Sequence, residues 1–279
     1  MSKNQLKRPR RNNTVTKHQL NWLWGHSSVF DTLTAGRWRV YELYVTEQIA
    51  MQNAERFAVA KENGTEIHIA DEAKLTELSG ARDHQGIVAR VSKYPYLTMD
   101  QFPELIKRTS DTEKSLLPLV VVADRIQDPL QFAALLRCCD AAGVSAMVIG
   151  EHCQAQVTTQ IARASLGAVN HFPIVQCGDL PVAAAQIKEL GCSLVAIDSA
   201  SETSLGEAKL DVPLALLLGS ETLGLNPLLA SLCDIQVRIP SFGNHVSLHA
   251  AVAAGVVLYE TRRQQSASHD RIVPCTTNP

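Results

Sequence analysis

Aromatic side chains are sparse in this sequence of 279 residues, at 5%, and no apolar run is long enough to cross a bilayer. The longest apolar run covers 250–259 and is rich in alanine, whereas a membrane span needs about 18 apolar residues or more. The polar start, MSKNQLKRPRRNN, also lacks the apolar core of a secretion signal. We therefore expect a globular protein of the cytoplasm that has no membrane partner.

Paired cysteine motifs are absent as well. The seven cysteines are an odd number, and no two of them form a C-x-x-C pair. Zinc sites need cysteine and histidine ligands clustered at short spacing, and this sequence has no such cluster. We therefore expect reduced, mostly buried thiols and no bound metal.

The common phosphate-binding motifs are missing too. No G-x-G-x-x-G follows an apolar run, and no G-x-x-x-x-G-K-[ST] occurs, which argues against a standard dinucleotide or NTP cradle. H-E-x-x-H and G-x-S-x-G are also absent, so the sequence does not predict the common metalloprotease or α/β-hydrolase sites.

Acidic residues are absent before Asp31. The formal net charge is −2, and the six lysines and arginines of this first stretch contribute +6, so the rest of the chain carries −8. We expect residues 1–20 to form a flexible basic arm that contacts phosphates. A solvated end without a partner is the alternative. An organelle transit peptide is a weaker alternative, because transit peptides are amphipathic and this stretch would have a poor apolar face.

Residues 21–92 have the pattern of a small α/β domain. Strand-like alternation occurs at 39–45, 65–69 and 86–91, and helical patterns occur at 25–33, 49–63 and 71–79. The following segment, 93–115, contains two prolines and mixed charges. We expect it to be a linker with one helix near 100–107.

From residue 116 onward, short apolar runs alternate with helical stretches. The predicted strands are 119–123, 146–149, 172–175, 193–197, 214–218 and 235–239, and the predicted helices are 131–142, 156–166, 180–190, 227–232 and 247–263. Such strands are typical of a parallel sheet buried on both faces. We expect an α/β domain over 116–264 and a flexible tail over 265–279, with ligands bound beyond the carboxyl ends of the strands.

Three segments that follow predicted strands resemble the signature motifs of the SpoU/TrmH family of RNA 2′-O-ribose methyltransferases. They occur in the family's order, at 123–143 (ADRIQDPLQFAALLRCCDAAG), 216–226 (LLLGSETLGLN) and 239–260 (IPSFGNHVSLHAAVAAGVVLYE). The turn at 163–168 (RASLGA) resembles the family's small-residue turn. Upstream, 25–45 and 84–91 resemble the family's substrate-binding domain, which is similar to ribosomal protein L30e.

This resemblance implies a SPOUT fold, in which the C-terminal chain threads through a loop to form a trefoil knot. Knots are otherwise nearly absent from proteins. The resemblance also implies S-adenosylmethionine as cofactor, a structured RNA as substrate and a homodimer with its site near the subunit interface. Two-domain members with this layout include the 23S rRNA guanosine-2′-O-methyltransferases, so we expect ribosomal RNA rather than transfer RNA.

The cofactor contacts implied by the resemblance fall on small and apolar residues. They are Gly219, Gly224, Ile239, Ser247 and Leu248. We expect these residues to offer backbone N–H and C=O groups and apolar walls to an adenine, because glycine lets the backbone approach a ligand closely.

Arg137 and Glu221 match the arginine of the first motif and the acid of the second. The resemblance implies that this arginine, with an RNA phosphate nearby, deprotonates the 2′-hydroxyl. A guanidinium stays charged at neutral pH, so stabilising a phosphate or a developing alkoxide suits it better. We expect Glu221 to orient Arg137 or a loop amide. Arg137 is also a candidate RNA contact, together with Arg37 and Arg39, which flank Trp38.

The chain departs from the family pattern at four positions. Gln131 and His249 stand where the family has asparagine, Ala133 stands where it has glycine, and Asn226 replaces the basic residue that usually follows the second motif's loop, which would remove one phosphate contact. Gln131 keeps the amide but moves it by more than about 1 Å, enough to disturb a catalytic contact, and His249 is able to act as a general base. We therefore predict an active methyltransferase with Arg137, Gln131, Glu221 and His249 in catalysis. The alternative is a weak or inactive relative that still binds RNA.

Overall fold

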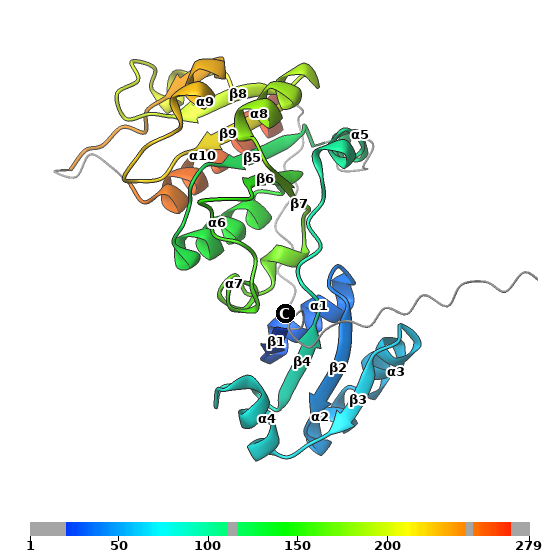
Figure 1. Cartoon of the computed structure of the whole chain (residues 1–279). Coiled ribbons are helices and arrows are strands. Elements are labelled where there is room, and N and C mark those ends of the chain that lie inside the picture. The colour runs from blue at the N-terminus through cyan, green and yellow to red at the C-terminus, as the bar shows by residue number, and fades with distance from the viewer. Residues whose placement is uncertain (1–20, 111–115, 244–247, 269–279) are drawn as a thin grey trace, which may run out of the picture.

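The computed structural model describes residues 21–110, 116–243 and 248–268, which form two sheets with their helices (Figure 1). The predicted basic arm at 1–20 and the predicted cofactor residue Ser247 lie outside the described residues. No helix in the described ranges is long and apolar enough to cross a membrane.

The first sheet has four strands in the order β1-β4-β2-β3. The strands are β1 (Asn21–Trp24), β2 (Val40–Val45), β3 (Glu66–Ile69) and β4 (Ile87–Val91), and the helices are α1 (His26–Ala35), α2 (Glu47–Gln52), α3 (Ala54–Glu62) and α4 (Glu72–Ser79). β2 pairs with β3 in parallel, whereas β4 runs antiparallel to both β1 and β2. The sequence pattern missed β1, because four residues are too few to show alternation.

The helix predicted at 49–63 is two helices. Asn53 separates them, since its backbone leaves the helical region (φ −126°) and its side-chain Nδ2 donates to the carbonyl of Ile49 at 3.1 Å. Asparagine competes with the helix in this way because its short amide reaches nearby backbone groups.

The second sheet has six strands in the order β10-β8-β9-β5-β6-β7, and all of its strand pairs in the described chain are parallel. The strands are β5 (Leu119–Ala123), β6 (Ala146–Gly150), β7 (Ile174–Cys177), β8 (Ser193–Ile197), β9 (Leu214–Leu218) and β10 (Ile235–Val237). The predicted mixed α/β fold with a parallel sheet is thus confirmed. β7 begins two residues later than predicted, just after Pro173, which has no backbone N–H to donate to the sheet.

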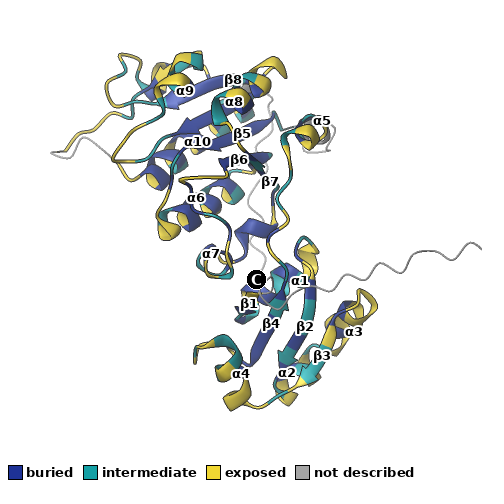
Figure 2. Cartoon of the chain, in the orientation of Figure 1, coloured by how far each residue is buried: buried dark blue, intermediate teal, exposed yellow. Residues whose placement is uncertain are grey.

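Helices cover both faces of this sheet. α6 (Pro129–Ala141) and α10 (Ala250–Ser268) pack on one face, and α8 (Leu180–Glu189) and α9 (Pro227–Leu232) on the other. Leu119 and Val121 of β5 contact the first layer, and Val120 contacts the second, as side-chain alternation along a strand requires. The central strands are accordingly buried along their whole length (Figure 2).

Several segments connect the two sheets. The chain passes from β4 through η2 (Met99–Gln101) and α5 (Phe102–Ser110) to the second sheet, where α7 (Thr159–Ala164), η3 (Ala168–Asn170) and η4 (Leu205–Glu207) complete the fold. α7 and η3 contact the first sheet and α1, so that one apolar core runs from Leu23 and Val29 to Val169 and Phe172. α10 extends to Ser268, four residues beyond the expected boundary at 264. The trefoil knot stays a prediction.

Candidate functional site

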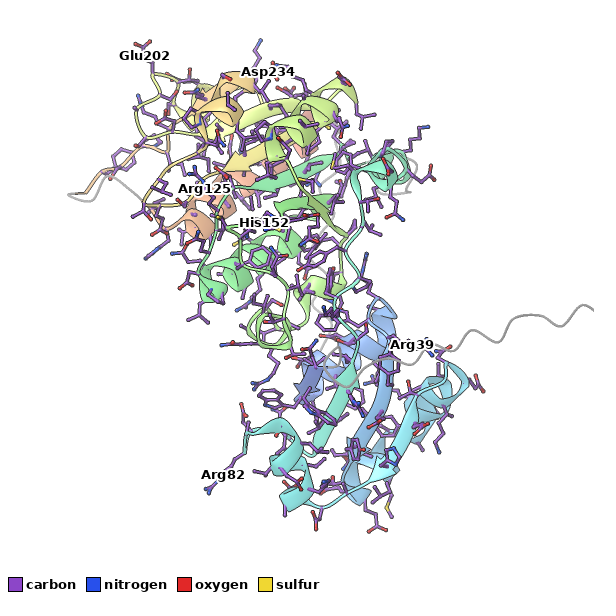
Figure 3. All side chains as sticks on the ribbon, viewed as in Figure 1. Arg39, Arg82, Arg125, His152, Glu202 and Asp234 are labelled. Carbon is purple, nitrogen blue, oxygen red and sulfur yellow. The ribbon has the colours of Figure 1, made fainter. Side chains whose placement is uncertain are left out.

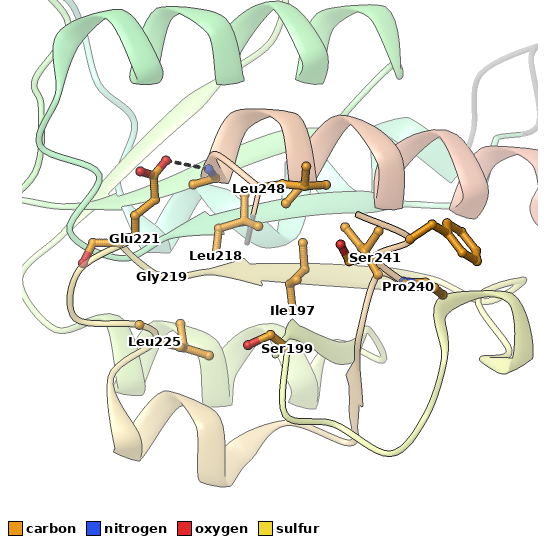
Figure 4. Close-up of a pocket in the computed structure, with 15 residues that line it drawn as sticks. Ile197, Ser199, Leu218, Gly219, Glu221, Leu225, Pro240, Ser241 and Leu248 are labelled. Atoms are coloured by element: carbon orange, nitrogen blue, oxygen red, sulfur yellow. Dashed lines mark hydrogen bonds between the residues drawn. The ribbon is translucent and has the colours of Figure 1, made fainter. Parts of the chain in front are cut away.

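A cavity of about 390 Å³ lies at the carboxyl ends of β8, β9 and β10 (Figure 4). Three loops and the start of α10 surround it, and its lining residues are Ile197, Ser199, Leu218, Gly219, Ser220, Glu221, Gly224, Leu225, Ile239, Pro240, Ser241, Phe242, Leu248, Ala250 and Ala253. Four of the five predicted cofactor residues are in this set, namely Gly219, Gly224, Ile239 and Leu248. The structure therefore brings together residues from the second and third motifs, which are separated by an α-helix and a strand in the chain.

The loop after β9 folds back closely on itself. A Cβ added to Gly219 would overlap with the backbone of Gly224 and Leu225, so only glycine fits there. Gly224 has a φ of 64°, which favours glycine, and its N–H donates to the carbonyl of Ser220 at 2.8 Å. These two glycines give the cavity a wall of tightly turned backbone.

Asp124 and Arg125, directly after β5, form hydrogen bonds with the β9 loop. The buried Asp124 carboxylate accepts hydrogen bonds from the Asn226 N–H at 2.8 Å and from Arg125 Nη2 at 3.0 Å. Arg125 Nη2 also lies 3.2 Å from the carbonyl of Gly224, and Arg125 itself has a left-handed backbone (φ 58°). A non-glycine residue in this conformation stores strain, which is common at functional sites. Sequence reasoning missed both residues.

Glu221 connects the β9 loop to the start of α10. Its Oε1 accepts a hydrogen bond from the Ala250 N–H at 3.0 Å (Figure 4). The same oxygen lies 2.7 Å from His249 Nδ1. A carboxylate only accepts hydrogen bonds, so Nδ1 carries the proton in this pair and Nε2 is the ring nitrogen that faces no partner within the described residues. The His249 side chain is 72% exposed. Glu221 therefore links the β9 loop to the first residue of α10 and to His249 just before it.

A second cavity of about 220 Å³ adjoins the first. Its lining includes Arg125, Gln127, Asp128, Gln131 and Leu223, and it shares Ser220 and Glu221 with the larger cavity. Gln131 reaches this position because Asp128 caps α6: its carboxylate accepts the Gln131 N–H at 2.8 Å, with Pro129 in the first turn. Gln131 and Glu221 are thus brought together.

Arg137 is not brought to either cavity of its own chain. It is exposed on α6, about 120° around the helix from Gln131, and it makes no hydrogen bond or ion pair with any residue in the described ranges. Its neighbour Cys138 donates to the carbonyl of Ala251 in α10, and burial raises the pKa of the Cys138 thiol while the Arg137 charge opposes that rise. Arg137 therefore lies beside the edge where α6 meets α10.

The predicted RNA contacts in the first domain have different surroundings. Arg37 Nε donates to the carbonyl of Asn170 at 2.7 Å, so Arg37 takes part in the contact between the two domains. Arg39 is exposed, with Cζ 5.0 Å from the ring centroid of Tyr41. Trp38 between them is buried in the core. No cluster of metal-ligating side chains occurs among residues 21–110, 116–243 and 248–268.

Two family models match the chain and cover most of it. Residues 118–259 match the SpoU rRNA Methylase family, and residues 22–97 match the RNA 2′-O ribose methyltransferase substrate-binding family. The first match includes the first two motif segments, the third segment up to residue 259, and the residues that line both cavities.

Individual relatives agree with these families. The chain is 31% identical over 249 residues to YacO of Bacillus subtilis (strain 168), a protein assigned by name to the TrmH family of tRNA/rRNA methyltransferases, and the match covers 89% of this chain and 97% of YacO. The crystal structure of the SpoU methyltransferase AviRb from Streptomyces viridochromogenes in complex with AdoMet is 25% identical, with a TM-score of 0.70, and covers 90% of this chain and 92% of AviRb. The structure of an RNA 2′-O ribose methyltransferase is 27% identical, with a TM-score of 0.65, covering 88% and 89% of the two chains.

Proposed function

Because the chain belongs to the SpoU rRNA methylase family, we propose that it methylates a ribose 2′-hydroxyl in ribosomal RNA. The chain is an RNA methyltransferase, and S-adenosylmethionine is its cofactor. The substrate-binding domain at 22–97 and the similarity to an RNA 2′-O ribose methyltransferase support the 2′-hydroxyl as the acceptor. The separate RNA domain supports ribosomal rather than transfer RNA as the substrate, and a cytoplasmic location remains a prediction.

The single observation that carries this proposal is the pair of adjoining cavities that share Ser220 and Glu221. A methyl transfer needs two sites in contact, one for the donor and one for the accepting nucleotide, with the reacting atoms held about 3–3.5 Å apart. The larger cavity suits the donor, and the smaller one, which contains Gln131, suits the ribose.

The larger cavity fits S-adenosylmethionine. Gly219 and Gly224 bring backbone N–H and C=O groups to its surface, while Ile197, Leu218 and Ile239 provide apolar walls for an adenine. When bound, the cofactor supplies a methyl group that is already activated on a sulfonium, so no metal is needed to activate it. The protein's task is to hold this donor still and to keep water away from the cavity.

His249 is the general base in this proposal. With its Nδ1–H donated to Glu221, the neutral ring offers Nε2 to the proton of the 2′-hydroxyl. Glu221 fixes the tautomer and would stabilise the imidazolium that forms, in the way a carboxylate assists histidine in hydrolases. Gln131 lines the smaller cavity, and in this proposal its side-chain amide hydrogen bonds to the ribose there.

We further propose that the protein is a homodimer and that Arg137 acts in the partner's site. The exposed face of α10 carries an apolar stripe of Val252, Val256 and Tyr259, which are 51%, 38% and 74% exposed. An exposed apolar stripe at helical spacing is typical of a protein–protein interface, and we infer that a second copy of this chain packs against it. Arg137 lies beside this edge and lines neither of these two cavities in its own chain, so in this proposal the dimer brings its charge to the partner's RNA.

Transfer of tritiated methyl groups from S-adenosylmethionine to RNA tests the proposal. The substrates are total rRNA and total tRNA from cells that lack this gene, and 2′-O-methylation is scored by resistance to alkaline cleavage at the labelled nucleotide. We expect label in rRNA at one alkali-resistant position. Label in tRNA alone would overturn the rRNA assignment, and label on a base would overturn the 2′-hydroxyl. Cofactor binding without any transfer would favour the alternative, an RNA-binding relative altered at Gln131, Ala133 and His249.

A further inference from the structure

A separate cleft of about 580 Å³ lies in the substrate-binding domain, far in the fold from the two cavities at the parallel sheet. The end of α1, the start of β2 and α3 form it, and its lining residues are Phe30, Thr32, Leu33, Thr34, Gly36, Trp38, Arg39, Val40, Arg56, Val59, Ala60, Asn63 and Thr65. Its volume is sufficient for a nucleotide, since small-molecule sites typically measure about 300–1,000 Å³.

Two arginines on this cleft carry charge that the described residues do not neutralise. Arg56 Cζ lies 5.1 Å from the ring centroid of Phe30, and Arg39 Cζ lies 5.0 Å from that of Tyr41. Neither guanidinium forms a hydrogen bond or a 4 Å ion pair with any residue in the described ranges. By contrast, Arg90 is paired with Glu42 at 2.8 Å in the same domain. Figure 3 shows Arg39 extending from the side of this domain.

Asp31 is a carboxylate that feels the charge of Arg56. Burial raises the pKa of Asp31, and the charges of His171 and then of Arg56 oppose that rise. Asp31 is not within ion-pair distance of Arg56 and does not line the cleft. The arginines therefore remain available to an anionic ligand.

Apolar side chains form much of the wall of the cleft. Phe30, Leu33 and Val59 provide flat or apolar surface. Trp38 also lines the cleft, but it is only 3% exposed, so it supports the wall from behind and offers no free ring face.

We propose that this cleft holds one unstacked nucleotide of the RNA substrate. The base packs against Phe30 and the exposed side chain of Val59, and Arg39 and Arg56 contact the flanking phosphates. Single-stranded RNA is usually recognised in this way, by stacking of bases on aromatic rings and by arginine contacts to phosphate. The inference rests on the proposed function in that the ligand is RNA, but it does not depend on which atom is methylated.

Binding of two fluorescein-labelled oligoribonucleotides to the full chain tests this proposal. One is a hairpin with a loop of eight uridines, and the other is a blunt duplex of the same length. The test variants are Arg39→Gln/Arg56→Gln and Phe30→Leu, and the control is Arg82→Gln, an exposed arginine of the same domain outside the cleft. Circular dichroism and S-adenosylmethionine affinity establish that each variant is folded.

We expect the wild type to bind the hairpin more tightly than the duplex. The double arginine variant should lose about tenfold or more in hairpin affinity, and its salt slope should fall by about 1.4, because each single-strand phosphate contact contributes roughly 0.7. Phe30→Leu should weaken hairpin binding by about five- to tenfold at an unchanged salt slope, since stacking is not ionic. Arg82→Gln should change neither quantity by more than about twofold.

Equal affinity of the wild type and the double arginine variant for the hairpin would overturn the inference, as would a failure of the wild type to prefer the hairpin. These results leave the proposed function intact if the wild type still methylates rRNA. Conversely, a wild type that binds the hairpin through this cleft but transfers no methyl group to RNA refutes the proposed function and leaves the cleft assignment standing.

Discussion

The guanidinium of Arg163 lies over the indole ring of Trp24, with Cζ 4.1 Å from the ring centroid, and its Nη2 donates to Asp83 at 2.6 Å. Arg163 belongs to α7 beside the parallel sheet, whereas Trp24 and Asp83 belong to the substrate-binding domain. Trp24 Nε1 also donates to Asp83 at 3.1 Å. The hydrogen bonds from Trp24 and then from Arg163 lower the pKa of Asp83. These three side chains tie the two domains together at one point.

Replacing Arg163 with alanine should loosen this joint without unfolding either domain. Arg37 and Tyr94 still donate to the carbonyls of Asn170 and Val169, so we expect a wider range of domain orientations rather than separation. The measurement is the distribution of distances between spin labels at positions 82 and 202, together with kinetics. KM for RNA should rise severalfold, with little change in the affinity for S-adenosylmethionine.

The matched control is Arg263→Ala, because Arg263 pairs with Glu260 inside a single helix. Recovery of the narrow distribution in Arg163→Lys would support an electrostatic joint, since lysine keeps the charge. A distribution in Arg163→Ala as narrow as that of the wild type would show that Arg163 does not set the orientation.

His249→Ala should lower the rate of methyl transfer by about 10²–10⁴ at neutral pH, the usual contribution of a general base. Glu221→Gln should lower the rate by a smaller factor, because an amide fixes the ring tautomer less firmly than a carboxylate. Single-turnover rates measure these effects, and an unchanged rate in His249→Ala would remove its role as base.

Gly219→Ala should weaken S-adenosylmethionine binding by about tenfold or more. The added Cβ overlaps with the backbone of Gly224 and Leu225, so the loop must open and its backbone groups leave the cavity wall. Titration calorimetry with S-adenosylmethionine measures the effect. Gly206→Ala is the control, because a Cβ at Gly206 meets no atom within 4 Å, and equal affinities of the two variants would contradict the prediction.

Asp124→Ala should destabilise the fold by about 1–3 kcal/mol, since it leaves the Asn226 N–H without its acceptor and frees the strained Arg125. The same change should reduce cofactor affinity through the β9 loop. Urea denaturation measures the free energy of unfolding. Asp179→Ala, which removes an exposed helix cap, serves as the comparison, because it affects stability without touching the loop.

Thiol labelling should distinguish one cysteine from the others. Burial raises the pKa of Cys177, Cys192 and Cys233 to about 11, so these thiols stay protonated and slow to react until well above neutral pH or until the chain unfolds. Cys153 is exposed. In a Cys275→Ser background, we expect one thiol to react quickly with an aromatic disulfide reagent at pH 7.5, and the Cys153→Ser variant should lose that fast phase.

The parallel sheet could be predicted because its central strands are apolar on both faces, a pattern that few other arrangements of strands produce. The motif resemblance also singled out Gly219, Ile239 and Leu248, which the structure places around one cavity. β1 could not be found from its four residues, and the break at Asn53 depends on a side-chain hydrogen bond. The roles of Asp124 and Arg125 could not be predicted from the sequence. The left-handed backbone of Arg125 and the hydrogen bond from the distant Asn226 N–H to the buried Asp124 carboxylate produce no periodic pattern of residues.

The loop that carries Ser220 and Glu221 lines both cavities and separates them. A molecule bound in either cavity contacts this loop, so we expect the affinity of each cavity for its ligand to depend on whether the other cavity is occupied. Thermodynamic linkage makes that influence equal in both directions. A single compound that joins an adenosyl group to a nucleoside by a short linker would occupy both cavities and bind more tightly than either group alone.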